Sequence, residues 1–203
     1  MTRNPNKAAR ETKRIYKDVD LRMKKVPAVC CQGCSHCCHQ LIKVHWAEGV
    51  LIEKYIIETF SKDQIETFSA RLEQWKNYLK DCTPNTDILE ASDINKFAAK
   101  VAEDHIPCFF LDNDSCAIYP VRPLICRTFV VTDDAKLCAI DPMRIGVMEG
   151  YSIQGDAMHE ITRAADSFQL RLLNYAVAET LGVRNLKPIG DFAITTLQRN
   201  HQT

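Results

Sequence analysis

Several common features are missing from this sequence of 203 residues, and each absence excludes a class of protein. The longest apolar runs carry charges, as VLIEKYII does at residues 50–57, so none approaches the roughly 20 residues of a membrane span. No apolar segment follows the basic start of the chain, so we expect no secretory signal and a cytoplasmic location. No low-complexity tract or internal repeat is present, and 46% of the residues are hydrophobic. These features predict a single domain over residues 1–203 with its own core.

The motifs of several enzyme classes are also missing. We find no glycine-rich loop after a predicted strand, no paired carboxylates and no serine triad. The aspartates between residues 112 and 134 are explained more simply as turn residues. The sequence therefore leaves open whether the protein is an enzyme.

Positive charge is concentrated at the beginning of a chain that is neutral overall. Residues 1–25 contain nine basic and three acidic side chains, whereas the whole chain has 26 of each sign. A basic N-terminal arm of this kind can contact nucleic acid or an acidic protein partner. A helix whose basic face is solvated, or docked on an acidic patch of its own domain, explains the same pattern more simply.

Hydrophobic periodicity predicts a mainly α fold. Helices are expected at about residues 8–25, 46–60, 61–79, 92–104, 156–182 and 191–199, of which 156–182 is a long C-terminal helix. Ser61 and Gln64 form a capping box at the start of the third of these helices. Residues 108–119 predict at most a short β-hairpin with its turn at 112–115. We therefore expect a single helical domain with an irregular cysteine-rich layer.

Ten cysteines stand out against these absences, and five of them lie within nine residues. The first group is Cys31-x2-Cys34-x2-Cys37-Cys38, and the second consists of Cys108, Cys116 and Cys126. In a reducing compartment, metal binding or redox chemistry is a better explanation for such thiols than disulfides. The spacing C-x2-C lets two thiolates reach one ion, and Gly33 tolerates the positive φ that such a turn often needs.

Seven thiols are too many for one tetrahedral ion, which takes four ligands. The surplus predicts at least two metal atoms, either with shared ligands or in an iron–sulfur cluster. Cys30 is a candidate for an eighth thiol, and His36, His39 and His45 are weaker alternatives. Cys30-x3-Cys34-x2-Cys37 also spells the radical-SAM triad, but the repeated strand–helix units of that barrel are not predicted here.

The complete pattern resembles the bacterial cysteine-cluster proteins that are named for CxxCxxCC and described as zinc- or iron-chelating. The resemblance covers residues 31–129 and rests on the first cysteine group followed by Pro107-Cys108-x2-Leu111, Cys116-x-Ile118-Tyr119 and Arg122-Pro123-x2-Cys126-Arg127-x-Phe129. It implies that the seven cysteines chelate metal, as an iron–sulfur cluster or as zinc. The same pattern occurs in flagellin lysine methylases, so a metal-dependent protein-modifying enzyme is an alternative, and a zinc-organised binding module is another.

Three residues of the second motif are expected beside the metal. Seven thiolates carry more negative charge than two divalent ions neutralise, so Arg122 and Arg127 are candidates to offset the remainder and to donate hydrogen bonds to sulfur. Salt bridges or contacts to backbone carbonyls are an equal alternative for both arginines. Tyr119 is expected to keep water from the site.

Overall fold

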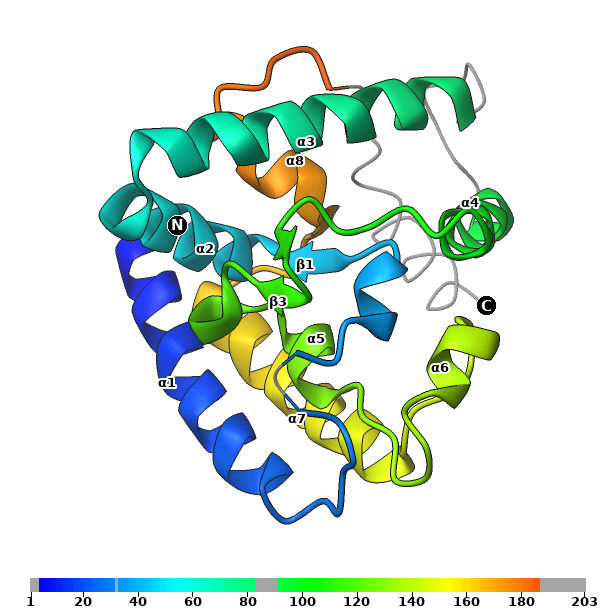
Figure 1. Cartoon of the computed structure of the whole chain (residues 1–203). Helices are drawn as coiled ribbons and strands as arrows, with labels where there is room; N and C mark the ends of the chain where they lie inside the picture. Colours follow the sequence, from blue (N-terminus) through cyan, green and yellow to red (C-terminus); the bar gives the residue numbers. More distant parts are fainter. Residues whose placement is uncertain (1–3, 32, 83–90, 187–203) are drawn as a thin grey trace, which may run out of the picture.

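The computed structural model describes residues 4–31, 33–82 and 91–186, and most of them are helical (Figure 1). The α-helices are α1 (Pro5–Met23), α2 (Trp46–Thr59), α3 (Lys62–Cys82), α4 (Ala91–Glu103), α5 (Leu124–Thr128), α6 (Leu137–Ile140), α7 (Met148–Ala165) and α8 (Leu173–Val177). Two 3-10 turns, η1 (His36–His39) and η2 (Tyr119–Val121), complete the helical elements of the described residues. The prediction of a mainly α fold is confirmed.

The strands are short and form two separate antiparallel pairs. The hairpin expected at residues 108–119 is present as β2 (Leu111–Asp112) and β3 (Ser115–Cys116), with Leu111 opposite Cys116. The second pair, β1 (Lys43–His45) with β4 (Leu170–Leu172), was not predicted. Three residues per strand are too few for an alternating pattern to stand out in the sequence.

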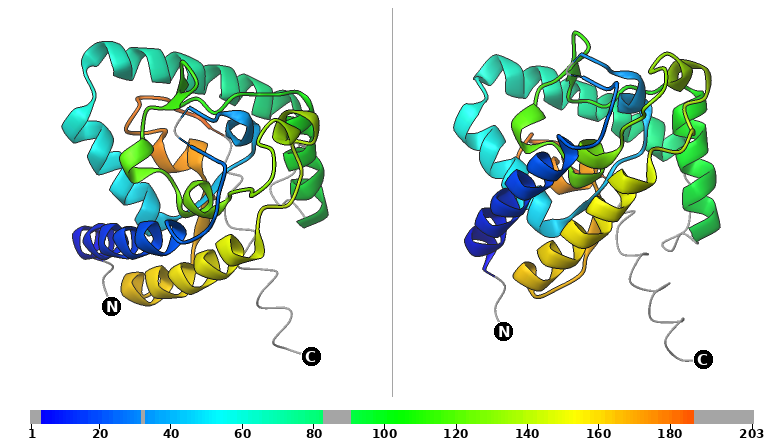
Figure 2. Two further views of the ribbon diagram at one scale, coloured as in Figure 1. Left: turned by 60° about the horizontal axis from the view of Figure 1, so that its bottom comes forward. Right: turned by 90° about the horizontal axis from the view of Figure 1, so that it is seen from below.

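Helix α1 belongs to the packed domain. Its apolar face is buried, and it lies along α7 and α2 (Figure 2). Asn4 caps its start by accepting a hydrogen bond from the Lys7 amide at 3.0 Å. Arg22 pairs with Asp156 of α7 at 2.6 Å. Residues 5–23 of the basic segment are therefore a helix that packs through its apolar face and forms ion pairs with α7 through Arg14 and Arg22.

The helices around the middle of the sequence begin close to the expected residues. Ser61 accepts a hydrogen bond from the Gln64 amide at 3.3 Å, and the Gln64 side chain accepts one from the Ser61 amide at 2.9 Å. This is the predicted capping box, and α3 follows it. α2 and α4 also lie within one or two residues of the predicted bounds.

The prediction of a single long helix at 156–182 is wrong. α7 begins earlier, at Met148, and ends at Ala165, because Asp166 adopts a left-handed conformation with φ of 51°. The Ser167 amide then bonds the Thr162 carbonyl at 3.3 Å, which closes the helix end. The apolar residues after this turn lie in β4 and α8 instead. The helix predicted at 191–199 lies outside the described residues.

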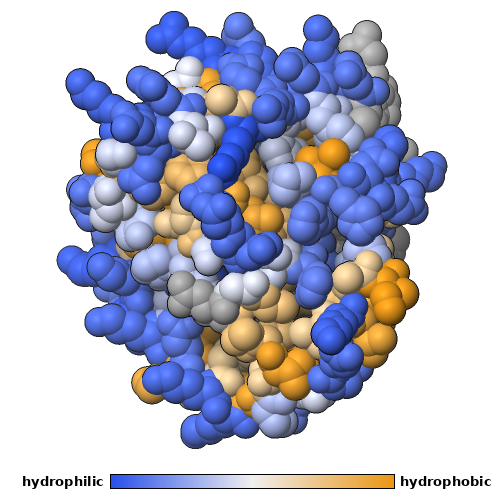
Figure 3. Space-filling model, in the orientation of Figure 1, coloured by the Kyte–Doolittle hydropathy of each residue, from blue (hydrophilic) through white to orange (hydrophobic). Residues whose placement is uncertain are grey.

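On the face shown in Figure 3, apolar side chains form a patch at the right-hand edge, on α6 and the segment that leads to α7. Its exposed members are Leu137, Ile140, Met143, Ile145 and Met148. Within the described ranges, no helix combines the length and the apolar character needed to cross a membrane.

Candidate metal centre

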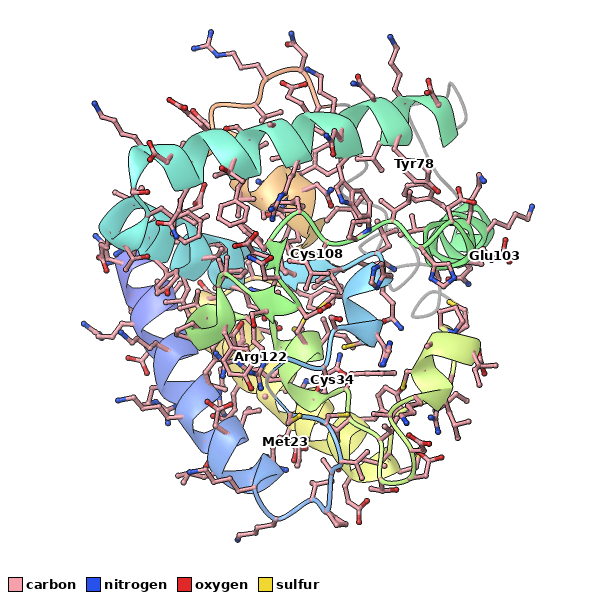
Figure 4. The ribbon with its side chains drawn as sticks, viewed as in Figure 1. Met23, Cys34, Tyr78, Glu103, Cys108 and Arg122 are labelled. Atoms are coloured by element: carbon pink, nitrogen blue, oxygen red, sulfur yellow. The ribbon has the colours of Figure 1, made fainter. Side chains whose placement is uncertain are left out.

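The two cysteine motifs line the same cavity, which has a volume of about 140 Å³. The cysteines that line it are Cys30, Cys31, Cys34, Cys37, Cys38, Cys108, Cys116 and Cys126. Cys34, Cys108 and Arg122 reach the middle of the molecule from three different segments (Figure 4). The seven predicted ligands and the candidate eighth, Cys30, are thus brought together although almost a hundred residues separate the first from the last.

Tight local turns present the first motif to the cavity. Gly33 has a φ of +94°, a conformation that side chains rarely adopt, and the Cys34 amide bonds the Cys31 carbonyl at 3.1 Å. The 3-10 turn η1 then carries Cys37 and Cys38. The positive φ expected at Gly33 is therefore present, and it reverses the chain between two thiols.

The core anchors the second motif. Phe110 is fully buried against Phe68 of α3, with ring centroids 5.6 Å apart, and Trp75 donates a hydrogen bond to the Pro107 carbonyl at 2.6 Å. These contacts fix the backbone on both sides of Cys108. The pairing of Leu111 with Cys116 then brings the second thiol of this motif beside the first.

Two hydrogen bonds join the motifs to each other. The Cys108 amide donates to the Cys38 carbonyl at 2.7 Å, and Ser35 donates to the Asp114 carboxylate in the hairpin turn at 2.7 Å. Direct contacts thus join the two walls of the cavity to each other.

A family profile matches this same region. The CxxCxxCC family, described as a "putative zinc- or iron-chelating domain", matches residues 30–143, which is more than half of the chain. The chain belongs to this family. Neither the curated proteins nor the solved structures yield a match. The matched part of the CxxCxxCC domain contains all eight cysteines of the cavity.

The sulfur donors fit the metals named in the family description. Thiolates favour zinc, iron and copper(I) over magnesium and calcium. Within the described residues, no group of three or more His, Cys, Asp or Glu side chains is arranged to hold a metal ion. The fit of this CxxCxxCC domain to a metal therefore rests on the chemistry of its donors and on the cavity they share.

Desolvation keeps most of these thiols protonated in the metal-free chain. Burial raises the pKa of Cys108 to about 12 and that of Cys126 well above its ordinary value, and it also raises the pKa of Cys116. The hydrogen bond between neighbouring thiols lowers the pKa of Cys37 and raises that of Cys38. Thiolate ligands must lose these protons when metal binds.

Arg122 and Arg127 both line the cavity, and the Nε of Arg122 is buried with no hydrogen-bond partner among the described residues. The Arg122 guanidinium lies over the Tyr119 ring, 3.9 Å from the centroid, and Tyr119 also lines the cavity. The charge of Arg122 adds to the lowering of the Cys37 pKa and partly offsets the burial that raises the pKa of Cys116. Tyr119, expected as a shield, thus also supports the guanidinium.

Arg127 differs from Arg122 in that every nitrogen of its guanidinium is hydrogen-bonded to other groups of the chain. It is buried, and its guanidinium donates to both carboxylate oxygens of Asp20 at 2.8 Å. It also donates to the carbonyls of Pro120 and Arg122, at 2.5 and 2.9 Å. These are the salt bridge and carbonyl contacts considered as the alternative for this residue.

The remaining candidates also have defined surroundings. Cys30 accepts a hydrogen bond from the Val131 amide at 3.4 Å. His45 is buried away from the cavity lining, where its ring caps α2 through the Ala47 amide at 3.2 Å and contacts the Ser167 carbonyl at 2.8 Å. His36 and His39 lie on η1 but do not line the cavity.

Cys138 of α6 belongs to neither cysteine motif. It is buried, and α6 packs against η1. Burial raises the pKa of Cys30 and of Cys34, and Cys138 adds a smaller contribution in the same direction. Arg144 contacts its sulfur at 3.8 Å. The sequence could have pointed to Cys138 only through the presence of a thiol, because no second cysteine lies at metal-ligand spacing from it.

Proposed function

We propose that this protein holds more than one thiophilic metal atom, as an iron–sulfur cluster or as zinc ions, in the cavity that both motifs line. The proposed ligands are Cys31, Cys34, Cys37, Cys38, Cys108, Cys116 and Cys126, with Cys30 as an additional candidate. The observation that carries the proposal is the common cavity of thiols from two distant stretches.

The number of donors supports more than one metal atom. A tetrahedral ion is saturated by four ligands, and eight thiols line this cavity. A volume of about 140 Å³ also exceeds the roughly 30 Å³ that one water occupies in the liquid, so there is room for several heavy atoms. When bound, the metal would supply Lewis acidity or electron transfer, depending on its identity.

The charge of the site supports the same proposal. Seven thiolates around two divalent ions leave a net negative charge, and the positively charged side chains Arg122 and Arg127 both line the cavity. A guanidinium can both offset that charge and donate hydrogen bonds to sulfur. The buried Nε of Arg122, which lacks a partner among the described residues, is available for this role.

Elemental analysis of protein purified without oxygen tests the proposal. We expect more than one metal atom per chain, with a brown colour and visible absorption for iron–sulfur or a colourless preparation for zinc. Cys34→Ser and Cys116→Ser, one from each motif, should both lower the metal content. Cys82→Ser is the matched control because this thiol belongs to neither motif. One metal atom per chain or fewer would overturn the proposal.

A further inference from the structure

A buried carboxylate lies behind the second cysteine motif and takes no part in lining the cavity. Glu48 of α2 is 1% exposed, and its two oxygens accept three hydrogen bonds. The donors are the Tyr16 hydroxyl at 2.5 Å, the His45 amide at 2.7 Å and the Leu124 amide at 2.7 Å. One carboxylate thus connects α1, the start of α2 and the start of α5.

The bond to Leu124 acts on the element that carries Cys126. α5 has only five residues, and so short a helix is not stable by itself in water. Its position must therefore be fixed by contacts with the rest of the domain. Glu48 satisfies the first amide of α5, two residues before the thiol, and its negative charge is favourable at a helix N-terminus.

Arg127, near the C-terminal end of α5, fixes the same segment through its side chain. Its guanidinium binds the carbonyls of Pro120 and Arg122, which immediately precede α5, and it also pairs with Asp20 of α1. The guanidinium lies 4.1 Å from the centroid of the Tyr16 ring. The hydroxyl of the same tyrosine donates to Glu48, so both buried charged groups contact Tyr16. The backbone on both sides of Cys126 is thereby tied to α1 and α2.

We propose that Glu48 and Arg127 are positioning residues for Cys126, and that they fix this thiol at the cavity wall by holding the short helix α5 against α1 and α2. The inference rests on the proposed function, since Cys126 is one of the proposed ligands. It also gives α1 a role, because Asp20 and Tyr16 complete the network from that helix.

The decisive variant is Glu48→Met, which keeps the approximate size of the side chain and removes every acceptor. Outer partners of metal ligands typically contribute about 10- to 100-fold to metal affinity, and we expect a loss in this range, measured by competition with a chelator. Glu48→Gln retains one acceptor oxygen for Leu124 and Tyr16 but turns its NH2 group toward the His45 amide, so it should restore part of the affinity. Equal losses in both variants would show that the charge, and not the hydrogen bond to α5, is what matters.

Alkylation mapped by mass spectrometry separates positioning from general destabilisation. In Glu48→Met, Cys126 should become reactive toward a maleimide while Cys108 stays as protected as in the unchanged protein. The control is Leu79→Ala, a core change in α3 that should lower the melting temperature and leave both thiols equally protected. If Cys126 is no more reactive in Glu48→Met than in Leu79→Ala, the proposal is overturned.

The two proposals fail in different ways. A lack of metal in the unchanged protein would remove the proposed function, whereas alkylation of the metal-free chains still reports whether Glu48 fixes Cys126. If Glu48→Met does not fold, Arg127→Lys provides the same test, because an ammonium group cannot bridge Asp20 and two carbonyls at once. It too should expose Cys126 selectively, and protection equal to that in Leu79→Ala would contradict the inference.

Discussion

The two walls of the cavity are built in different ways. The first motif has tight turns of its own and no buried residue in η1, and Cys31 is exposed. The second motif is anchored by Phe110 and Trp75, and desolvation raises the pKa of Cys108 to about 12. The wall formed by the second motif is therefore fixed by the core, whereas the first motif is joined to the rest of the chain by hydrogen bonds of Cys30, Ser35 and Cys38.

This difference indicates how metal binding and folding are coupled. A ligand held by the core needs little ordering when metal binds, while a turn held by local bonds is ordered by the metal itself. The first motif should therefore depend on metal for its structure, and the second should depend on it mainly for its charge. The predictions below test this contrast from the largest expected effect to the smallest.

Metal removal should have the largest effect, and it should be uneven. Structural zinc contributes roughly 10–16 kcal/mol of apparent binding free energy in small domains, and that energy is lost on chelation. We expect amide hydrogen exchange to rise much more in residues 33–40 than in residues 108–118. The measurement is exchange mass spectrometry before and after chelation. A uniform rise in both segments would refute the contrast between the walls.

Single ligands should differ in the same direction. Cys108→Ser removes a desolvated thiol and should cost about 3 kcal/mol, a quarter share of the lower estimates of zinc binding energy, or about 100-fold in affinity. Cys31→Ser removes an exposed thiol, for which water or Cys30 can substitute, and should cost less. Chelator competition measures both variants. A larger loss of metal affinity in Cys31→Ser than in Cys108→Ser would mean that the first motif, and not the second, is the more rigidly held wall.

High pH should destabilise the metal-free protein. The unfolded chain loses the Cys108 proton near the ordinary pKa of 9.0, whereas the folded chain keeps it until about pH 12, so stability falls as pH rises between these values. The slope approaches about 1.4 kcal/mol per pH unit for such a thiol. Melting temperatures at pH 8 and pH 10 check it, and Cys108→Ser should reduce the slope without abolishing it, because burial also raises the pKa of Cys116 and Cys126. Metal-loaded protein should show no such fall, because its thiols are already deprotonated.

The cysteines were the part of the site that the sequence predicted best. The spacing of Cys31, Cys34 and Cys37 reflects how far a thiolate can reach around an ion, and this constraint is local. The pairing of Leu111 with Cys116 was also local, because turn residues at 112–115 mark the hairpin. Which sulfur binds which atom stays a prediction.

The parts that the sequence could not predict depend on distant contacts. Glu48 looks like an ordinary first-turn acid of α2, and its bond to Leu124 joins residues 76 positions apart. The end of α7 at Asp166 was missed because Leu170–Leu172 is apolar enough to continue a helix, and pairing with β1 decides otherwise. Arg127 could not be assigned to Asp20 before α1 was placed beside α5.

The smallest effect is expected from Gly33→Ala in the first motif. Nothing lies within 4 Å of the position an added Cβ would take, so the change costs only the strain of φ +94°, roughly 1–3 kcal/mol. Because no core contact holds this turn in place, its backbone should relax around the new side chain, and metal affinity should fall only a few-fold. Gly155→Ala is the matched control, since this exposed position in α7 is equally open but helical, where alanine stabilises by roughly 0.5–1 kcal/mol. Both are measured by thermal unfolding and chelator competition. A loss in Gly33→Ala as large as that in Cys108→Ser would mean that the first motif is as rigid as the second.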